Sequence, residues 1–249
     1  MDSHPARRRT ALVTGASRGI GRAIAAQLAA DGYDLLLAAR DVDALEDVAA
    51  QLRTDQNRVS VATANMADEA EVEALASAQL ALAPHLDVLV LAAGAAMSGA
   101  IDSLPLRRLD TQLAVNLRAP FHLIQRLLPA LRVAAGSSPT GAKVIAIASI
   151  TGVVSETGLA GYGASKAALI SLCETLSAEE GENGVSATAL SPGFVDTDMT
   201  EWMRDRIDPA EMITVGDVAE LTRALCRLSR YAVVPNIVLT RPGAQLWRA

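Results

Sequence analysis

The sequence predicts an α/β fold: a single domain with a doubly wound, Rossmann-type, mostly parallel seven-stranded sheet and helices on both faces. Short apolar runs alternate with helical patterns along the whole chain, which is typical of parallel strands joined by right-handed crossovers. The 249 residues are 51% hydrophobic but only 3% aromatic. That composition suits buried strands covered by helices rich in Ala and Leu.

The elements follow in order from these patterns. Strands are expected at Ala11–Thr14, Asp34–Ala39, Val59–Ala64, Asp87–Leu91, Lys143–Ala148, Val185–Leu190 and Asn236–Thr240. Helices are expected at Gly19–Asp31, Asp43–Arg53, Glu69–Ala83, Leu106–Ala135, Tyr162–Glu182 and Val215–Ser229. No repeat or linker divides residues 10–249, so they are interpreted as one domain. Function is expected in the loops that follow the strands.

Composition argues against several classes of partner. A net charge of −6 without a long basic run argues against nucleic acid. No uninterrupted apolar stretch has membrane-spanning length, so no membrane association is expected. Met1–Arg9 contains Arg7, Arg8 and Arg9 but no apolar segment behind them, which indicates a flexible solvated tail and not a signal peptide. Cys173 and Cys226 are expected to be buried free thiols, consistent with a reducing cytoplasm.

A glycine-rich loop joins the first strand to the first helix and reads Thr14-Gly15-Ala16-Ser17-Arg18-Gly19-Ile20-Gly21. Glycines let a backbone turn tightly and approach a pyrophosphate, and the helix N-terminus offers free N–H groups and a positive dipole end. A plain glycine-rich turn is the structural alternative. Because the loop lies between the first strand and first helix of an α/β alternation, we interpret it as a nucleotide-binding loop.

The end of the second strand indicates which coenzyme is bound. An NAD site usually has an acidic residue here for the ribose hydroxyls, whereas an arginine accommodates the 2′-phosphate of NADP. This strand ends in Ala38-Ala39-Arg40, and Arg40 and Arg18 together would clamp a phosphate. The alternative is that both arginines are ordinary surface residues, and the neighbouring Asp41 is an acidic residue of the kind that an NAD site has. The sequence favours NADP (NADPH) over NAD.

Tyr162 and Lys166 are one helical turn apart, which predicts an acid/base pair. An ammonium at this spacing favours the phenolate and so lowers the pKa of the tyrosine. Ser149 directly follows the strand that ends at Ala148, where its hydroxyl would hydrogen-bond the group that the phenol attacks. Alone, such a pair is usually an ordinary contact. The glycine loop supplies a cofactor for it and favours the functional interpretation.

With both motifs in view, the chain resembles the classical-type short-chain dehydrogenase/reductase family over essentially its whole length after the tail. The resemblance rests on T-G-x-x-x-G-x-G at Thr14–Gly21, Asn116 in Val115-Asn116-Leu117, Ser149, Tyr162-x-x-x-Lys166, Ser191-Pro192-Gly193 and Thr197. It implies that Tyr162 is the general acid/base, that Lys166 lowers its pKa and binds the nicotinamide ribose, and that Ser149 orients the carbonyl. Asn116 would hold a water that connects Lys166 to solvent. The structural alternatives are a helix-interior amide bonded to backbone for Asn116 and a strand-end cap for Ser149.

The resemblance also implies a set of cofactor contacts and no metal site. The implied contacts are Gly15, Ser17, Arg18, Gly19, Ile20, Gly21, Arg40, Asn65, Met66, Ala92, Ala93, Gly94, Tyr162, Lys166, Pro192, Gly193, Val195 and Thr197. Two positions depart from the family pattern. Asn65 replaces a frequent acidic residue near the adenine. Leu91-Ala92-Ala93-Gly94 replaces Asn-Asn-Ala-Gly and removes amides that would brace the central sheet.

The predicted function is hydride transfer between a nicotinamide cofactor and an apolar carbonyl compound or secondary alcohol. Three segments are expected to wall an apolar pocket, and the last of them would be a substrate lid: Ala95–Leu104, Ile150–Gly161 and Val195–Ile213. The Met and Trp residues of these segments could equally belong to the hydrophobic core instead of lining the pocket. The resemblance implies a homodimer or homotetramer that pairs through helices 106–135 and 162–182.

Two alternatives remain open. A ketoacyl reductase for carrier-protein substrates would need a basic patch near the pocket, whereas the catalytic helix ends with Glu174, Glu179, Glu180 and Glu182. A non-enzymatic dinucleotide sensor would be expected to lack the tyrosine or the lysine, and both are present.

Overall fold

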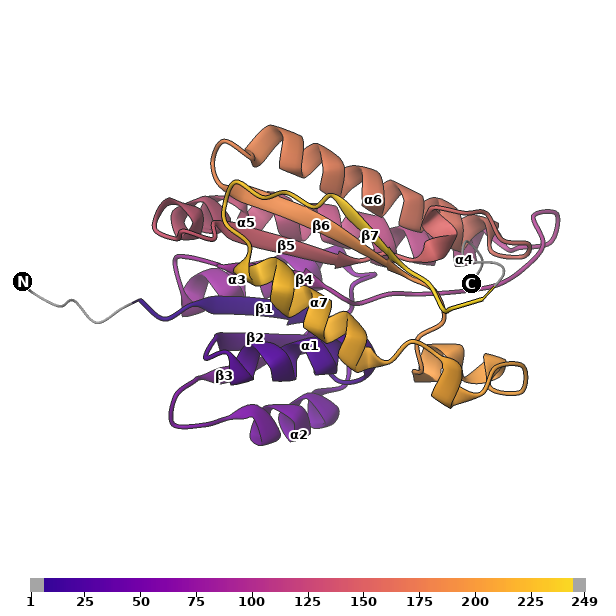
Figure 1. The fold of residues 1–249 in the computed structure, drawn as a ribbon, viewed down its shortest axis with the longest axis horizontal. Coiled ribbons are helices and arrows are strands. Elements are labelled where there is room, and N and C mark those ends of the chain that lie inside the picture. The colour runs from indigo at the N-terminus through magenta and orange to yellow at the C-terminus, as the bar shows by residue number, and fades with distance from the viewer. Residues whose placement is uncertain (1–6, 244–249) are drawn as a thin grey trace, which may run out of the picture.

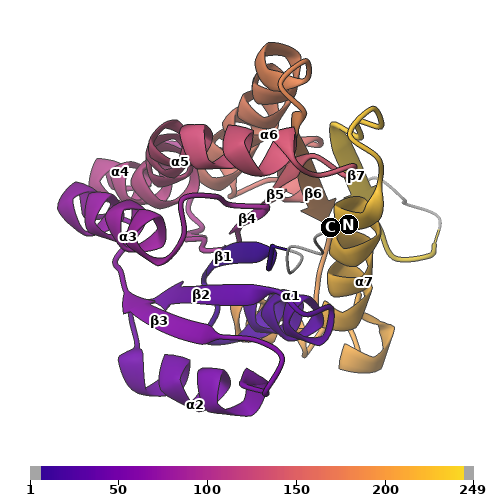
Figure 2. The same cartoon turned by 90° about the vertical axis from the view of Figure 1, so that its left-hand side faces the viewer.

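The computed structural model describes residues 7–243 and places a parallel sheet between two layers of helices (Figures 1 and 2). The seven strands have the order β3-β2-β1-β4-β5-β6-β7, and every neighbouring pair is parallel. Their bounds are β1 Thr10–Thr14, β2 Asp34–Ala39, β3 Val59–Thr63, β4 Val88–Leu91, β5 Ala142–Ile147, β6 Val185–Pro192 and β7 Asn236–Leu239. The predicted fold class is confirmed.

The helices divide between the two faces of the sheet (Figure 2). One face carries α1 Gly19–Ala30, α2 Val42–Leu52 and α7 Val215–Arg227, with α1 packed on α7. The other face carries α3 Glu69–Leu82, α5 Ala119–Gly136 and α6 Ala160–Glu180, and α4 Leu106–Leu113 packs against α6. Both faces are therefore covered, as the continuous apolar strands require.

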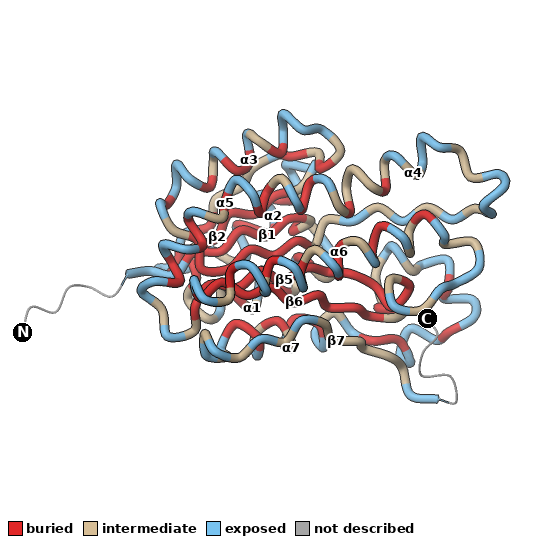
Figure 3. Tube along the Cα trace, turned by 90° about the horizontal axis from the view of Figure 1, so that it is seen from above, coloured by how far each residue is buried: buried red, intermediate tan, exposed pale blue. Residues whose placement is uncertain are grey.

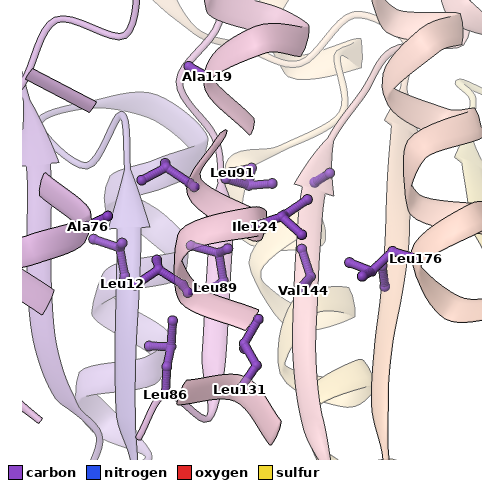
Figure 4. Packing of buried hydrophobic residues seen from close by; sticks show 14 of the residues in the cluster. Leu12, Ala76, Leu86, Leu89, Leu91, Ala119, Ile124, Leu131, Val144 and Leu176 are labelled. Atoms are coloured by element: carbon purple, nitrogen blue, oxygen red, sulfur yellow. The ribbon is translucent and has the colours of Figure 1, made fainter. Parts of the chain in front are cut away.

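The core lies on both sides of the sheet because successive strand residues point to opposite faces. Leu12, Leu89 and Val144 belong to one cluster, which α5 covers with Ile124 and Leu131 (Figure 4). Their chain neighbours Val13, Val90 and Ile145 belong to the cluster under α1 and α7. The buried class in Figure 3 accordingly follows the central strands and the inner faces of the helices.

The predicted helix 106–135 is interrupted, which corrects the prediction of one continuous helix. Residues Ala114–Arg118 form a π-helical turn (η1) between α4 and α5, in which the Ala119 N–H donates to the carbonyl oxygen of Ala114. Pro120 is the cause that the sequence contains. It has no N–H to donate to the carbonyl of Asn116 four residues earlier, so the regular α-helical bond cannot form there.

Three short 3-10 helices lie at the carboxyl side of the sheet: η2 Ile150–Gly152, η3 Asp198–Met203 and η4 Pro209–Glu211. The last two belong to the 195–213 segment, which lies beyond the strand ends in Figure 1. A small apolar cluster of Phe194, Met203, Ile207 and Met212 holds this segment together. Met203 therefore packs inward, whereas Met199 and Trp202 are about half exposed, at 48% and 58%.

The described part of the N-terminal segment contacts residues at the amino-terminal ends of the strands. Arg7 donates to both carboxylate oxygens of buried Asp87, at 2.9 and 2.7 Å. Arg9 lies 4.1 Å above the centroid of the Tyr33 ring. These arginines are thus held against the domain, and residues 1–6 of the predicted tail lie outside the described residues.

Two further expectations concern the cysteines and the membrane. Cys173 and Cys226 are free and buried, as predicted. Within residues 7–243, none of the helices is long and apolar enough to cross a bilayer.

Candidate active site

The predicted site residues gather at the carboxyl ends of β1, β4, β5 and β6. Strand β1 lies between β2 and β4, so the strand order reverses there. Open parallel sheets bind ligands in the crevice at such a reversal. The glycine loop follows β1 and Ala92–Gly94 follows β4. The two loops therefore flank one crevice.

The glycine loop has the backbone of an anion cradle. Gly15 and Gly19 have φ angles of +67° and +55°, a region that favours glycine. A Cβ on Gly21 would lie 2.3 Å from the Gly15 carbonyl oxygen, and one on Gly15 would lie 2.8 Å from the amide nitrogen of Ala93. Helix α1 begins at Gly19 with no acidic residue in its first turn. The free N–H groups and the close packing fit the pyrophosphate of a dinucleotide.

Thr14 braces the two loops, a role that the sequence analysis missed. Its hydroxyl oxygen accepts hydrogen bonds from the amides of Ala92 and Ala93, at 3.1 and 3.2 Å. The hydroxyl also donates to the carbonyl of Val90, at 3.2 Å. The loop after β4 is thus fixed to β1 without the two asparagine amides that the family pattern would supply.

Four predicted catalytic residues come together on three elements. Ser149 follows β5, Asn116 lies in η1, and Tyr162 and Lys166 lie on α6. The Lys166 Nζ atom is 5.7 Å from the centroid of the Tyr162 ring and donates to the carbonyl of Ile147 at 2.7 Å. A Cβ on Gly94 would lie 3.6 Å from Lys166 Nζ and 3.7 Å from Asn116 Oδ1. The loop after β4 therefore passes directly over these side chains.

Ser149 is both a strand-end cap and a hydrogen-bond donor. Its Oγ accepts from the amide and the hydroxyl of Thr151, at 3.2 and 2.9 Å. Because both lone pairs of the oxygen are engaged, its own proton is free to be donated. A side-chain hydrogen bond from Ser149 acts on the phenol of Tyr162 and opposes the rise of its pKa. Thr151, which the sequence analysis did not select, thus fixes the direction of the Ser149 hydroxyl.

The side chain of Asn116 braces the backbone, as the structural alternative described. Its Oδ1 accepts from the amide of Ala95 at 2.8 Å, and its Nδ2 donates to the carbonyl of Ala95 at 2.8 Å. Nδ2 also donates to Ser165 Oγ at 2.9 Å, and that hydroxyl donates to the carbonyl of Tyr162 at 2.7 Å. Asn116 therefore links the 95–104 segment to the start of the catalytic helix.

Burial shifts the pKa of both central groups. It raises the pKa of the Tyr162 phenol above its usual range, against the opposing effect of Ser149. The predicted net lowering of this pKa is therefore wrong. Burial also lowers the pKa of Lys166 to about 8. Both shifts favour the neutral form of the side chain.

The adenine side of the predicted site is more open. Arg40 is exposed at the end of β2, and Arg18 donates to Asp198 of η3 at 3.0 Å. Asp41 caps α2 by accepting from the amide of Ala44 at 3.1 Å. Asn65 Oδ1 accepts from the amide of Ala67 at 3.1 Å. Its neighbour Met66 belongs to the buried core and not to the loop surface.

The predicted nicotinamide side follows β6. Pro192 ends the strand, and the amide of Gly193 donates to the carbonyl of Leu239 at 2.9 Å. Val195 is buried and pairs with Ile213 in an isolated parallel bridge. Thr197 is the N-cap of η3, and its Cγ2 is 3.4 Å from the position of a Cβ on Gly19. The chain thus returns from β6 to the glycine loop.

Gln112 is a further residue that the sequence analysis missed. It is fully buried on α4, and its Oε1 accepts from the amide of Met97 at 3.0 Å. Its Nε2 has no hydrogen-bond partner within the described residues. The sequence signal that could have identified Gln112 is its position as a polar residue on the buried face of an amphipathic helix.

Comparison with known proteins identifies the family and supports the fold. Residues 9–208 match the family model of short chain dehydrogenases. A 3-oxoacyl-[acyl-carrier-protein] reductase of Staphylococcus aureus is 34% identical over 80% of this chain and 79% of its own length. Nodulation protein G of a Rhizobium species is 36% identical over 89% of both chains.

Two solved structures have the same fold over nearly the whole chain. The Pseudomonas aeruginosa RhlG/NADP active-site complex has a TM-score of 0.84 and 31% identity, covering 95% of this chain and 96% of its own. An alcohol dehydrogenase of the archaeon Thermococcus sibiricus, complexed with 5-hydroxy-NADP, has a TM-score of 0.83 and 29% identity, covering 95% of this chain and 100% of its own.

Proposed function

Because the chain belongs to the short-chain dehydrogenase family, whose members are oxidoreductases that use nicotinamide cofactors, we propose that it reduces an apolar ketone or aldehyde with NADPH, or oxidises the matching alcohol. The convergence of Ser149, Tyr162 and Lys166 beside the glycine cradle carries this proposal. When bound, the coenzyme supplies or accepts the hydride. The protein supplies position and the proton.

The side chains act on the substrate oxygen. In the reductive direction Tyr162 gives its phenolic proton to that oxygen, and the free O–H of Ser149 holds the same oxygen by a hydrogen bond. The raised pKa leaves the phenol protonated at neutral pH, so it has a proton to give, but it also makes the phenol a weaker acid. In the oxidative direction the phenolate must form, and a charged Lys166 favours it. Because the pKa of Lys166 is about 8, the ammonium is present below that pH and favours the phenolate that oxidation needs.

The preference for NADPH is supported by the charges near the ends of β1 and β2. Arg18 and Arg40 are both exposed on the loops that follow these strands. Asp41, the acidic residue that a ribose diol would need, instead caps α2. Two exposed arginines beside an Asp41 that caps a helix favour a 2′-phosphate.

The substrate class follows from the walls of the site. Ile101, Val153, Met199 and Trp202 are exposed at 84%, 43%, 48% and 58%. They come from the three wall segments, so apolar side chains surround the entrance. An apolar substrate would cover them.

A panel of ketones, aldehydes and secondary alcohols tests the proposal through the absorbance of reduced nicotinamide, with NADPH and NADH run side by side. We expect turnover of apolar carbonyls with NADPH and slower turnover with NADH. Tight NADPH binding without turnover of any panel member would instead favour a dinucleotide sensor.

Reduction of carrier-linked ketoacyl chains is the second candidate. The Staphylococcus aureus relative carries that name, and Arg107 and Arg108 are exposed on α4, directly after the 95–104 wall. Against it, Glu174 and Glu179 are exposed on α6, and Glu182 is exposed just after its end. If it is correct, a carrier-linked substrate has a higher kcat/KM than its free thioester analogue. The difference should shrink in R107Q/R108Q and persist in R126Q, which changes an arginine on α5.

We also propose a homodimer or homotetramer that pairs through α5 and α6. Phe121, an aromatic residue on α5, is 52% exposed and would be covered by such pairing. Sedimentation of the full chain should give two or four times the mass of 25.9 kDa.

A further inference from the structure

Three consecutive residues of the 195–213 segment each lie beside a different part of the proposed coenzyme site. Thr197 Cγ2 is 3.4 Å from the position of a Cβ on Gly19. Asp198 accepts a hydrogen bond from Arg18 Nη1 at 3.0 Å. Met199 Cε lies 4.0 Å from the position of a Cβ on Gly94. We call residues 197–199 the strap.

The strap lies beside the crevice in which the proposed function places the coenzyme. One end lies on the glycine cradle, and the other lies beside Gly94, close to Lys166. Asp198 lies between these ends and is the acidic member of the strap. Its carboxylate accepts a hydrogen bond from Arg18, the arginine that the 2′-phosphate of NADPH would need.

The pair of Asp198 and Arg18 is open to exchange. Their side chains are 64% and 71% exposed, so the ion pair is weak and screened by salt. A phosphate offers three acceptor oxygens and close to two negative charges, and binds a guanidinium more strongly than one carboxylate does. The 2′-phosphate of NADPH is therefore able to displace Asp198 from Arg18.

An ordinary surface ion pair is the simplest other explanation of this contact. Against it, both chain neighbours of Asp198 lie next to glycines of the same site, Thr197 next to Gly19 and Met199 next to Gly94. Arg18 and Asp198 are also 180 positions apart in the sequence, so the contact depends on the whole strap lying over the glycine loop.

We propose that Asp198 determines coenzyme preference by competing with the 2′-phosphate of NADPH for Arg18. The inference rests on the proposed function, because it needs NADPH to bind in this crevice. NADPH must break the ion pair and then tolerate a carboxylate near its phosphate. NADH has no 2′-phosphate and leaves the pair intact. Asp198 therefore reduces the ratio by which the protein binds NADPH more tightly than NADH.

Asp198→Asn tests the inference, with the dissociation constants of NADPH and NADH measured separately by the fluorescence of the reduced nicotinamide. We expect the constant for NADPH to fall about two- to fivefold, the range open to an exposed ion pair, and the effect to shrink at high salt. The constant for NADH should stay the same. Glu201→Gln is the matched control, because it removes the same charge from the same helix η3 and its partner is Arg204, at 3.8 Å.

A double-mutant cycle isolates the pair. Arg18→Gln should weaken NADPH binding, and Asp198→Asn should no longer change the ratio of the two constants in that background. If the wild type binds NADPH but D198N leaves the ratio unchanged, or E201Q changes it equally, the inference is wrong and the proposed function stands. If the wild type binds neither coenzyme, the proposed function and the inference both fail.

Discussion

At the scale of single residues, desolvation decides the chemistry of the site. Burial raises the pKa of Tyr162 and lowers that of Lys166 to about 8. The phenol therefore stays protonated at neutral pH, and the amine titrates close to that range. A lysine on an exposed helix would keep its ordinary pKa of 10.5 and would not titrate there.

Tyr162→Phe should remove catalysis and leave coenzyme binding nearly intact. The phenyl ring keeps the packing of the tyrosine but has no proton to give, so we expect kcat to fall by about 10²- to 10⁴-fold. Turnover and NADPH fluorescence titration measure the two effects. Tyr231→Phe, which removes the same hydroxyl from an 89% exposed side chain, is the control and should change neither. Equal loss of binding and turnover in Y162F would count against the acid/base role.

Lys166→Met should abolish turnover and also change how stability depends on pH. In the folded protein the pKa of Lys166 is about 8, below its ordinary value of 10.5. Below pH 8 the cost of burying the ammonium is fully present. As pH rises from 8 toward 10.5 the folded state loses the proton first, so wild-type stability should rise relative to K166M by up to about 3 kcal/mol.

Denaturant unfolding of both proteins between pH 7 and 10 measures this difference. Lys143→Met is the matched control, because Lys143 is also buried but donates to Ser186 at 3.1 Å, outside the catalytic set. It should retain turnover. Parallel pH dependences of the wild type and K166M would show that Lys166 is not titrating in this window.

At the scale of elements, two local devices shape the site. The π turn η1 carries Asn116 between α4 and α5, and its side chain bonds both polar groups of the Ala95 backbone. The hydroxyl of Thr14 fixes the loop after β4 to the end of β1. The side chains of Asn116 and Thr14 both hold backbone segments in place and do not touch the reacting atoms. Losing either side chain should therefore lower activity by moving the residues of the site.

Pro120→Ala restores the N–H that an α-helical bond to the Asn116 carbonyl needs. We expect the helix to regularise and Asn116 to shift, which should lower kcat by up to about 100-fold while the melting temperature stays the same or rises. Pro129→Ala makes the same change further along α5 and should leave kcat unaltered. Full activity in P120A would mean that the position of Asn116 does not depend on the proline.

Thr14→Val removes the hydroxyl that accepts from Ala92 and Ala93. We expect a loss of about 1–3 kcal/mol in the free energy of unfolding and weaker NADPH binding, because two amides lose their acceptor in the crevice. Thr10→Val is the control on the same strand: its hydroxyl donates to the carbonyl of His85 at 2.8 Å, at the opposite end of β1. T10V should lower stability without changing the affinity for NADPH.

At the scale of the whole molecule, ion pairs tie neighbouring helices together on each face of the sheet. Arg223 of α7 donates to Asp31 at the end of α1 at 3.0 Å, and Arg132 of α5 donates to Glu180 of α6 at 2.8 Å. Glu180 is 7% exposed, and its hydrogen bonds from Arg132 and Asn183 lower its pKa against the effect of burial.

Glu180→Gln should therefore destabilise the protein in a pH-dependent way. A carboxyl whose pKa is lowered in the folded state stabilises it fully above its unfolded pKa, and that contribution is lost as pH falls through the folded value. We expect E180Q to lose about 1–3 kcal/mol at pH 7, with the difference from wild type disappearing in acid. Unfolding curves at pH 7 and below 4 measure it. Exposed Glu179→Gln should show little change at either pH.

Much of the architecture was predictable because it depends on local patterns. The predicted strand at Asp34–Ala39 has the bounds of β2, and the other strands differ by a few residues at their ends. The interruption of helix 106–135 was missed although Pro120 is visible, because a proline can end, kink or widen a helix and periodicity does not distinguish these outcomes. The helices η3 and η4 were missed because short segments held by a few apolar contacts have no period.

Residue type and spacing along the chain were enough to predict the fold class, the glycine loop and the four polar residues of the candidate site. Tertiary structure decided the rest. The direction of the Tyr162 pKa shift depends on how much surrounding chain excludes water, and the strap contacts join Arg18 to a residue 180 positions away. Desolvation and long-range contact are properties of the packed molecule, so no local pattern in the sequence contains them.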